Sequence, residues 1–213
     1  MTASQDAVPV RDAKTVQILI AAKDTFLELG YAAASMDQVA QRARVSKTTL
    51  YTRFPSKEAL FAATISAECE RRGMRFQPED FDDLPLEEAL RAIARRFLDL
   101  IWSPEAIQVQ QTVTGEAARF PEVARIFFDA GPAHGRAAVA AFFAHAAARG
   151  VARVDDPEFT AQQFMGALQG GPHCELTLCL CAPPSGEERE SHIRKAVALF
   201  VTGVGAAVAA APH

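Results

Sequence analysis

The sequence predicts an all-α protein, made of a small N-terminal three-helix part and a larger helical part. Alanine is abundant, and β-branched residues rarely alternate with polar ones, which favours helices over strands. Hydrophobic residues make up 49% of the 213 positions, so the chain can bury a core. Capping residues and prolines recur at the spacing of helix ends, and they divide the chain into successive helices.

The first helix is predicted over residues 12–29, because Gly30 follows at the position of a helix C-cap. Its inward stripe would consist of Val16, Leu19, Phe26 and Leu29. Ser35 opens the capping-box pattern Ser-Met-Asp-Gln and a short second helix over residues 36–43. Ser46 would cap a third helix over residues 47–53, which Pro55 ends. The second and third helices, joined by a tight turn, form a helix-turn-helix.

A fourth helix is predicted over residues 57–72, with Leu60, Ala63, Thr64 and Ala67 facing inward. The acidic, proline-flanked stretch at residues 77–85 then separates two substructures. Later helices are expected at 86–102, 104–119, 121–129, 132–149, 157 towards 181, and 186–210. Ala130-Gly131-Pro132 would split two of them, and Gly170-Gly171-Pro172 would kink another. The expected division is a disordered tail at 1–11, a first domain at 12–57 and a second at 58–213.

Charge is unevenly distributed along the chain, whose formal net charge is −4. Residues 1–75 carry eleven Lys and Arg against eight Asp and Glu, whereas residues 76–213 carry eleven against eighteen. Between Gln38 and Lys57 five basic residues occur without an acidic one. A basic patch on an acidic chain indicates a polyanionic partner at one end, although a solvated face without a partner gives the same pattern.

Neither secretion nor a membrane span is expected. The polar, proline-bearing start lacks the pattern of a signal peptide, and the uncharged segment 196–211 is short for a span and is better explained as a packing helix. Four cysteines are too few for a secreted disulfide framework in a chain of this size. The sequence therefore predicts a cytoplasmic protein without a membrane partner.

The third helix has the character of a recognition helix, which places its N-terminal residues in the major groove of DNA. Small hydroxyl side chains and lysine suit base edges and phosphate oxygens, and Leu50 and Phe54 are expected in the core. The predicted contacts to double-stranded DNA are Ser35, Arg44, Ser46, Lys47, Thr48, Thr49, Tyr51, Thr52 and Lys57.

Residues 15–61 resemble the DNA-binding domain of TetR-type transcriptional regulators. The resemblance is carried by AAKDTFLELGY, SMDQVAQRARVSKTTLY and FPSKEALF. Arg44 departs from the family, which usually has glycine in this turn, so this arginine must tolerate the turn geometry, with αL as one option. The second half, from GEAARFPEVARIFF to VDDPEFTAQQFMGAL, resembles the C-terminal domain of the AefR-like subgroup. The resemblance implies a homodimer formed by the last two helices and an effector pocket among the middle helices.

The apolar stripe of the last helix supports dimerisation independently, although a core helix of a monomer remains an alternative. The predicted interface consists of Phe164, Ile193, Val197, Val201, Val204 and Val208. Aromatic and polar side chains mix in the middle helices, as they would around a small hydrophobic effector, although aromatics at helical spacing also suit a plain core. The predicted effector contacts are Phe97, Ile101, Trp102, Gln108, Gln111, Thr112, Phe127, Phe128, His134, Phe142, Phe164, Gln169 and His173.

Cys174, Cys179 and Cys181 raise the alternative of a thiol-redox sensor. In a helix, the first and last would stand about 10 Å apart along the axis, beyond disulfide or single-metal reach, so they are predicted as buried small hydrophobes. A dimeric all-α enzyme is the other alternative, although HExxH, GxSxG, GxGxxG and P-loop motifs are absent from the sequence. The prediction is a ligand-responsive regulator, favoured as a repressor of a palindromic operator, without catalytic residues, metal or cofactor.

Overall fold

A computed structural model describes residues 12–204, and every regular element within that range is helical. Contacts divide the chain into two compact units between Thr64 and Ile65, inside the fourth helix. The sequence placed this division after residue 57, at the start of that helix. Residues 1–11, predicted as a disordered tail, lie outside the described residues.

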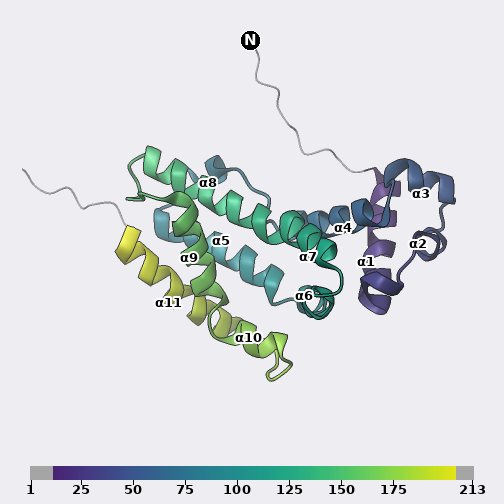
Figure 1. Ribbon diagram of the computed structural model, residues 1–213. Helices are drawn as coiled ribbons and strands as arrows, with labels where there is room; N and C mark the ends of the chain where they lie inside the picture. Colours follow the sequence, from purple (N-terminus) through teal and green to yellow (C-terminus); the bar gives the residue numbers. More distant parts are fainter. Residues whose placement is uncertain (1–11, 205–213) are drawn as a thin grey trace, which may run out of the picture. The chain divides into compact units, whose positions relative to one another are not determined.

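The first unit holds α1 (Ala13–Ala33), α2 (Met36–Arg42), α3 (Lys47–Arg53) and the first part of α4 (Lys57–Arg71), as Figure 1 shows. Gly30 has φ of +75°, so the regular turns of α1 are interrupted at the predicted C-cap glycine. The Ser35 hydroxyl accepts from the backbone N–H of Gln38, whose side chain accepts from the Ser35 N–H, which confirms the capping box.

The core of the first unit differs in part from the predicted stripe of α1. Val16 and Leu29 are 42% and 38% exposed, whereas Ile18 and Ala22 are fully buried. Ile18, Ala22 and Phe26 are successive i, i+4 positions, so the buried face is rotated from the one that the sequence suggested. Three aromatic rings complete this core, with centroids 5.1–5.9 Å apart: Phe26, Tyr31 and Phe61.

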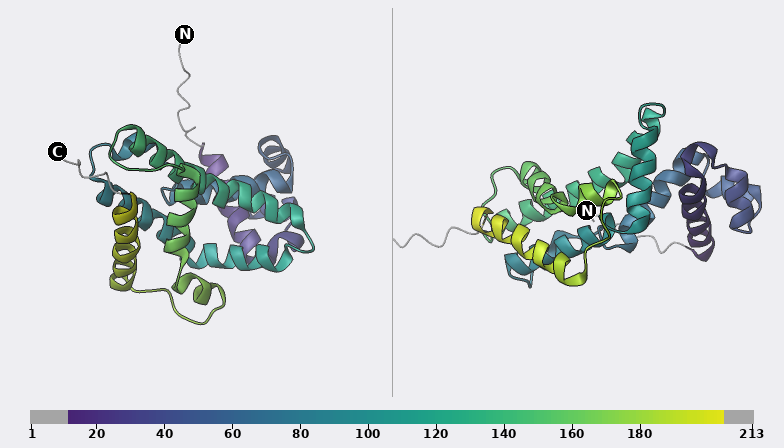
Figure 2. Two further views of the ribbon diagram at one scale, coloured as in Figure 1. Left: turned by 60° about the vertical axis from the view of Figure 1, so that its left-hand side comes forward. Right: turned by 90° about the horizontal axis from the view of Figure 1, so that it is seen from below.

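The second unit contains the rest of α4 and all later elements. These are η1 (Pro78–Phe81), α5 (Leu86–Ile101), α6 (Pro104–Glu116), α7 (Pro121–Phe128), η2 (Asp129–Ala133), α8 (His134–Ala148), α9 (Pro157–Gln169), α10 (Pro172–Thr177) and α11 (Gly186–Val204). Figure 2 shows α11, in yellow, beside α9 and α5, and both pairs are in contact. Phe143, Phe164, Ile193 and Val197 are fully buried in the resulting core.

Two predicted helix boundaries are wrong. Ala130-Gly131-Pro132 does not split the chain, because residues 129–133 form a π-helical turn that joins α7 to α8. A wider turn accommodates Pro132, which lacks an N–H to donate. The predicted kink after residue 169 is instead a full break, since Gly171 has φ of +79° before α10 begins. The expected extension of the last helix to residue 210 lies outside the described residues.

The inward face of α4 also includes more than the predicted residues. Leu60 and Thr64 are buried as expected, whereas Ala63 and Ala67 are only half-buried. Phe61, Ile65 and Cys69 supply the remainder of the buried face. Within residues 12–204, none of the helices has the length and apolar character needed to cross a membrane.

Candidate functional site

Helix α3 separates a buried face from an exposed one. Leu50 is fully buried and Phe54 is 8% exposed, as the sequence predicted. Thr48, Tyr51 and Thr52 lie at i, i+3 and i+4 on the outer side and are exposed. The Ser46 hydroxyl caps this helix by accepting from the Thr49 N–H at 3.1 Å. The first unit therefore holds α3 by its apolar side and presents hydroxyl groups to solvent.

The turn between α2 and α3 contains the exposed residue Arg44 with φ of +50°. This is the left-handed conformation that the sequence offered as one way to accommodate arginine here. It costs a non-glycine residue about 1–2 kcal/mol. A ladder of local bonds holds the turn, since Arg44 N–H donates to the Gln41 carbonyl and Val45 N–H to the Ala40 carbonyl.

Two of the predicted DNA-contacting lysines have partners within the first unit. Lys47 Nζ donates to Asp37 Oδ2 at 2.6 Å, and this carboxylate raises the pKa of Lys47. Lys57 Nζ donates to the carbonyls of Tyr31 at 2.9 Å and Ala34 at 3.1 Å, and it lies over the Tyr31 ring. Lys57 thus caps the end of α1, a role that the sequence did not indicate.

The predicted effector residues are divided between the packed core and the surface of the second unit. Phe97, Phe142 and Phe164 are nearly or fully buried, and a series of edge-to-face ring contacts runs from Phe81 through Phe142 and Phe143 to Phe164. These aromatics are packed core, which is the alternative that the sequence left open. The rest range from buried Trp102 and half-buried Ile101, Gln111, Thr112 and Phe127 to exposed Gln108, Phe128, His134 and Gln169.

His173 is the exception among the predicted polar contacts. It is 8% exposed, and neither ring nitrogen has a hydrogen-bond partner among the described residues. Burial lowers the pKa of His173, so the ring is neutral at pH 7. By contrast, the Gln111 amide is used within the fold, where it donates to the Thr177 carbonyl at 2.6 Å.

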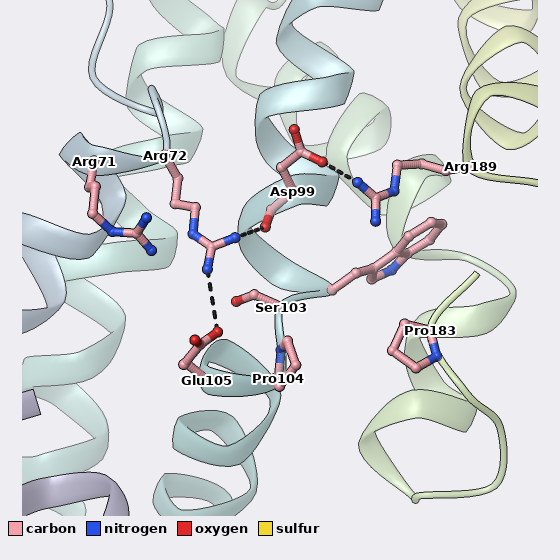
Figure 3. A pocket seen from close by; sticks show the side chains of 9 residues that line it. Arg71, Arg72, Asp99, Ser103, Pro104, Glu105, Pro183 and Arg189 are labelled. Atoms are coloured by element: carbon pink, nitrogen blue, oxygen red, sulfur yellow. Dashed lines mark hydrogen bonds and ion pairs between the residues drawn. The ribbon is translucent and has the colours of Figure 1, made fainter. Parts of the chain in front are cut away.

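A hollow of about 710 Å³ lies elsewhere in the second unit, at the ends of α4, α5 and α6. Figure 3 shows Arg72, Asp99 and Arg189 on its wall, with Asp99 between the two guanidinium groups. Of the predicted effector residues, Trp102 alone lines this hollow. Arg72 and Arg189 are more than 100 positions apart in the sequence, so no sequence pattern predicted that they line the same hollow.

Three predicted interface residues are part of the protomer core. Phe164, Ile193 and Val197 are fully buried, because the apolar side of α11 packs against α5 and α9 of the same chain. Val201 is half-buried, whereas neither the side chain of Val204 nor residue Val208 is among the described parts. The outward side of α11 carries Leu199, which is 71% exposed.

The three clustered cysteines are exposed, so the prediction that they are buried is wrong. Helix α10 ends at Thr177, and Cys179 has φ of +58° in the loop that follows. Partial desolvation and the Glu175 carboxylate raise the pKa of Cys181, which keeps its thiol protonated at neutral pH. Exposure favours redox chemistry here, whereas the protonated state of Cys181 disfavours it.

Comparisons with known families agree with this arrangement. Residues 18–64 match the tetR family of bacterial regulatory proteins, and residues 88–203, more than half of the chain, match the C-terminal domain of AefR-like transcriptional repressors. The chain belongs to the TetR family. It is thus an HTH-type DNA-binding transcriptional regulator, as the sequence resemblance implied.

Individual TetR relatives match in whole or in part. The flavonoid-responsive regulator FrrA has a solved structure that is 34% identical, with a TM-score of 0.73 over 93% of this chain and 100% of that one. A TetR-family regulator from Mesorhizobium loti is 25% identical, with a TM-score of 0.75 over 90% of this chain and 96% of that one.

Two curated relatives match over shorter stretches. The transcriptional activator FasR of Mycolicibacterium smegmatis is 36% identical over 97 residues, which is 43% of this chain and 42% of FasR. The regulator RutR of Escherichia coli K12 is 49% identical over 53 residues, a quarter of each chain. The chain thus matches less than half the length of these two relatives.

Proposed function

We propose that this TetR-family chain is a repressor that binds a palindromic operator as a homodimer and releases it when a small effector binds the second unit. The observation that carries the DNA-binding part is the exposed face of α3, with Thr48, Tyr51 and Thr52 side by side. Such a face can enter the major groove, where hydroxyl groups and a phenol meet base edges and phosphates.

The second unit supplies the reasons for a dimer and an effector. The family is typically dimeric, and Leu199 on α11 and Phe159 on α9 are large apolar side chains left 71% and 59% exposed. A second copy of the chain would cover them. FrrA is named for its response to flavonoids, and this likeness supports a small-molecule effector here.

Repression, rather than activation, is part of the proposal because the family match over residues 88–203 is to AefR-like repressors. FasR, which matches over a shorter stretch, is named as an activator. Deleting the gene and measuring transcripts of its neighbours separates the two cases. A repressor gives raised transcripts, and lowered transcripts would show activation.

DNA binding is tested by mobility shift with the DNA upstream of the protein's own gene. Tyr51→Ala and Lys47→Ala are expected to weaken binding, and each lost phosphate contact flattens the dependence of log affinity on log salt by about 0.9. Arg95→Ala, an exposed arginine of the second unit, is the matched control and should bind as the parent does. Unchanged affinity in both α3 variants would refute the assignment of α3 as the recognition helix.

A further inference from the structure

The hollow at the ends of α4, α5 and α6 has the size of a small-molecule site. Its volume of about 710 Å³ lies within the range of roughly 300–1,000 Å³ that is usual for ligand pockets. Its wall combines three arginines with the rings of Trp102, Pro104 and Pro183. We propose that this hollow binds a small organic carboxylate with an apolar body.

The two carboxylates of the wall are already paired. Arg189 forms an ion pair with the Asp99 carboxylate, and Arg72 donates to Glu105 Oε2 at 3.3 Å (Figure 3). Arg72 also donates to the Asp99 carbonyl at 2.6 Å and to Glu68 Oε1 at 3.1 Å. A cationic ligand would therefore have to displace an arginine before it met a carboxylate.

The unsatisfied groups of the wall are donors. Trp102 is 2% exposed, and its indole Nε1 is buried without a hydrogen-bond partner. Nε of Arg189 is likewise buried and unpartnered. No buried side-chain acceptor of the lining residues lacks a partner within the described chain. A ligand that fits must bring acceptors, and an ionised carboxylate has only acceptors.

The charge of the wall favours an anionic acceptor over a neutral one. Among the lining residues, Arg71, Arg72 and Arg189 stand against two carboxylates, Asp99 and Glu105, while Glu68, which is outside the lining, pairs with Arg71 and Arg72. Hydrogen bonds to an ionised oxygen are shorter and about twice as strong as those to a neutral one. The exposed Pro104 and Pro183 offer surface to a hydrocarbon body, which inorganic phosphate lacks. The role of this carboxylate as the effector rests on the proposed function. Its binding to the hollow does not depend on that function.

Trp102 is the single tryptophan of the chain, so its fluorescence reports from the wall of the hollow itself. The full-length protein is titrated without DNA, at constant ionic strength, with cyclohexanecarboxylate, its neutral amide cyclohexanecarboxamide, and inorganic phosphate. We expect a saturable change with the carboxylate and at least about tenfold weaker binding of the amide and of phosphate.

Arg189→Gln should weaken carboxylate binding by at least about tenfold. Arg95→Gln is the matched control, because it also removes an ion pair between α5 and α11, with Glu190, but does not line the hollow. Circular dichroism of each variant verifies folding, and the comparison of the three ligands on the parent protein needs no variant.

The proposed site is wrong if cyclohexanecarboxylate produces no saturable fluorescence change, or if the amide or phosphate binds as tightly as the carboxylate. It is also wrong if a folded Arg189→Gln protein binds the carboxylate as tightly as the parent does. Since no DNA is present, none of these results depends on whether the chain represses a gene.

Discussion

Replacing Leu199 tests whether α11 forms the proposed dimer interface. Leu199 is 71% exposed, while Ile193 and Val197 on the other side of the same helix are fully buried. In an isologous interface each protomer contributes the same surface, so one substitution removes two copies of the side chain. Leu199→Ala should therefore weaken the dimer without unfolding the protomer.

The expected change in the dimer dissociation constant follows from the exposed fraction of the Leu199 side chain. Burying a whole leucine side chain contributes about 1.5–3 kcal/mol. Since 71% of Leu199 is exposed in the protomer, about 1–2 kcal/mol of that is available to association. Two copies give up to about 2–4 kcal/mol, or a dissociation constant raised by up to about 30- to 1,000-fold. Leu199→Glu adds the cost of an unpaired carboxylate at an apolar surface and should weaken the dimer further.

The assay is sedimentation velocity over a dilution series, with circular dichroism to verify helix content. Ile193→Ala is the control on the same helix, because it should lower the free energy of unfolding by about 2–5 kcal/mol through a core cavity. Val197→Glu should likewise unfold the protomer, because Val197 is fully buried, and it should not simply separate folded protomers. If Leu199→Ala and Leu199→Glu dissociate at the same concentration as the parent, the interface does not include this face of α11.

Further predictions concern packing, pH and the thiols. Gly131→Ala places a methyl group 3.2 Å from the Ile65 side chain, whereas Gly166→Ala meets open space. Gly131→Ala should therefore have a lower melting temperature than Gly166→Ala, which thermal melts of the two variants measure. Because burial lowers the pKa of His173, the unfolded state binds the proton first, and stability should fall as the pH drops below about 6.5. His173→Leu should flatten that dependence, and a melting temperature with an unchanged pH profile would contradict it. Substituting Cys174, Cys179 and Cys181 together by Ser should leave effector release of DNA intact, measured by mobility shift; loss of release in the folded triple variant would identify the thiols as the sensor.

The local signals in the sequence were reliable because they act over a few residues. The N-cap hydroxyls of Ser35 and Ser46 each accept from an N–H three residues later, and both start helices as predicted. The buried face of α3 followed from the same kind of signal, since Leu50 and Phe54 are four positions apart on one face. Helix capping and hydrophobic periodicity depend on neighbouring residues alone, so they can be recognised without the rest of the chain.

What the sequence could not provide was the identity of the partner surface. The stripe through Ile193 and Val197 is apolar, but amphipathicity does not distinguish α5 of the same chain from a helix of a second copy. Lys47 showed the same difficulty with charge. Its partner Asp37 lies ten positions earlier, on another helix, and the basic run that begins after it concealed the pair.

Helix α4 links the two units through one continuous stretch of chain. Leu60 and Phe61 belong to the core of the first unit, while Arg71 at its other end lines the hollow of the second. A carboxylate in the hollow would compete with Glu105 for Arg72 and so loosen the end of α4 from α6. An effector that lowers DNA affinity tenfold must bind the DNA-free arrangement about 1.4 kcal/mol more tightly than the DNA-bound one. One hydrogen bond to a charged group contributes about 1.5–3 kcal/mol, which is of the same order as this difference.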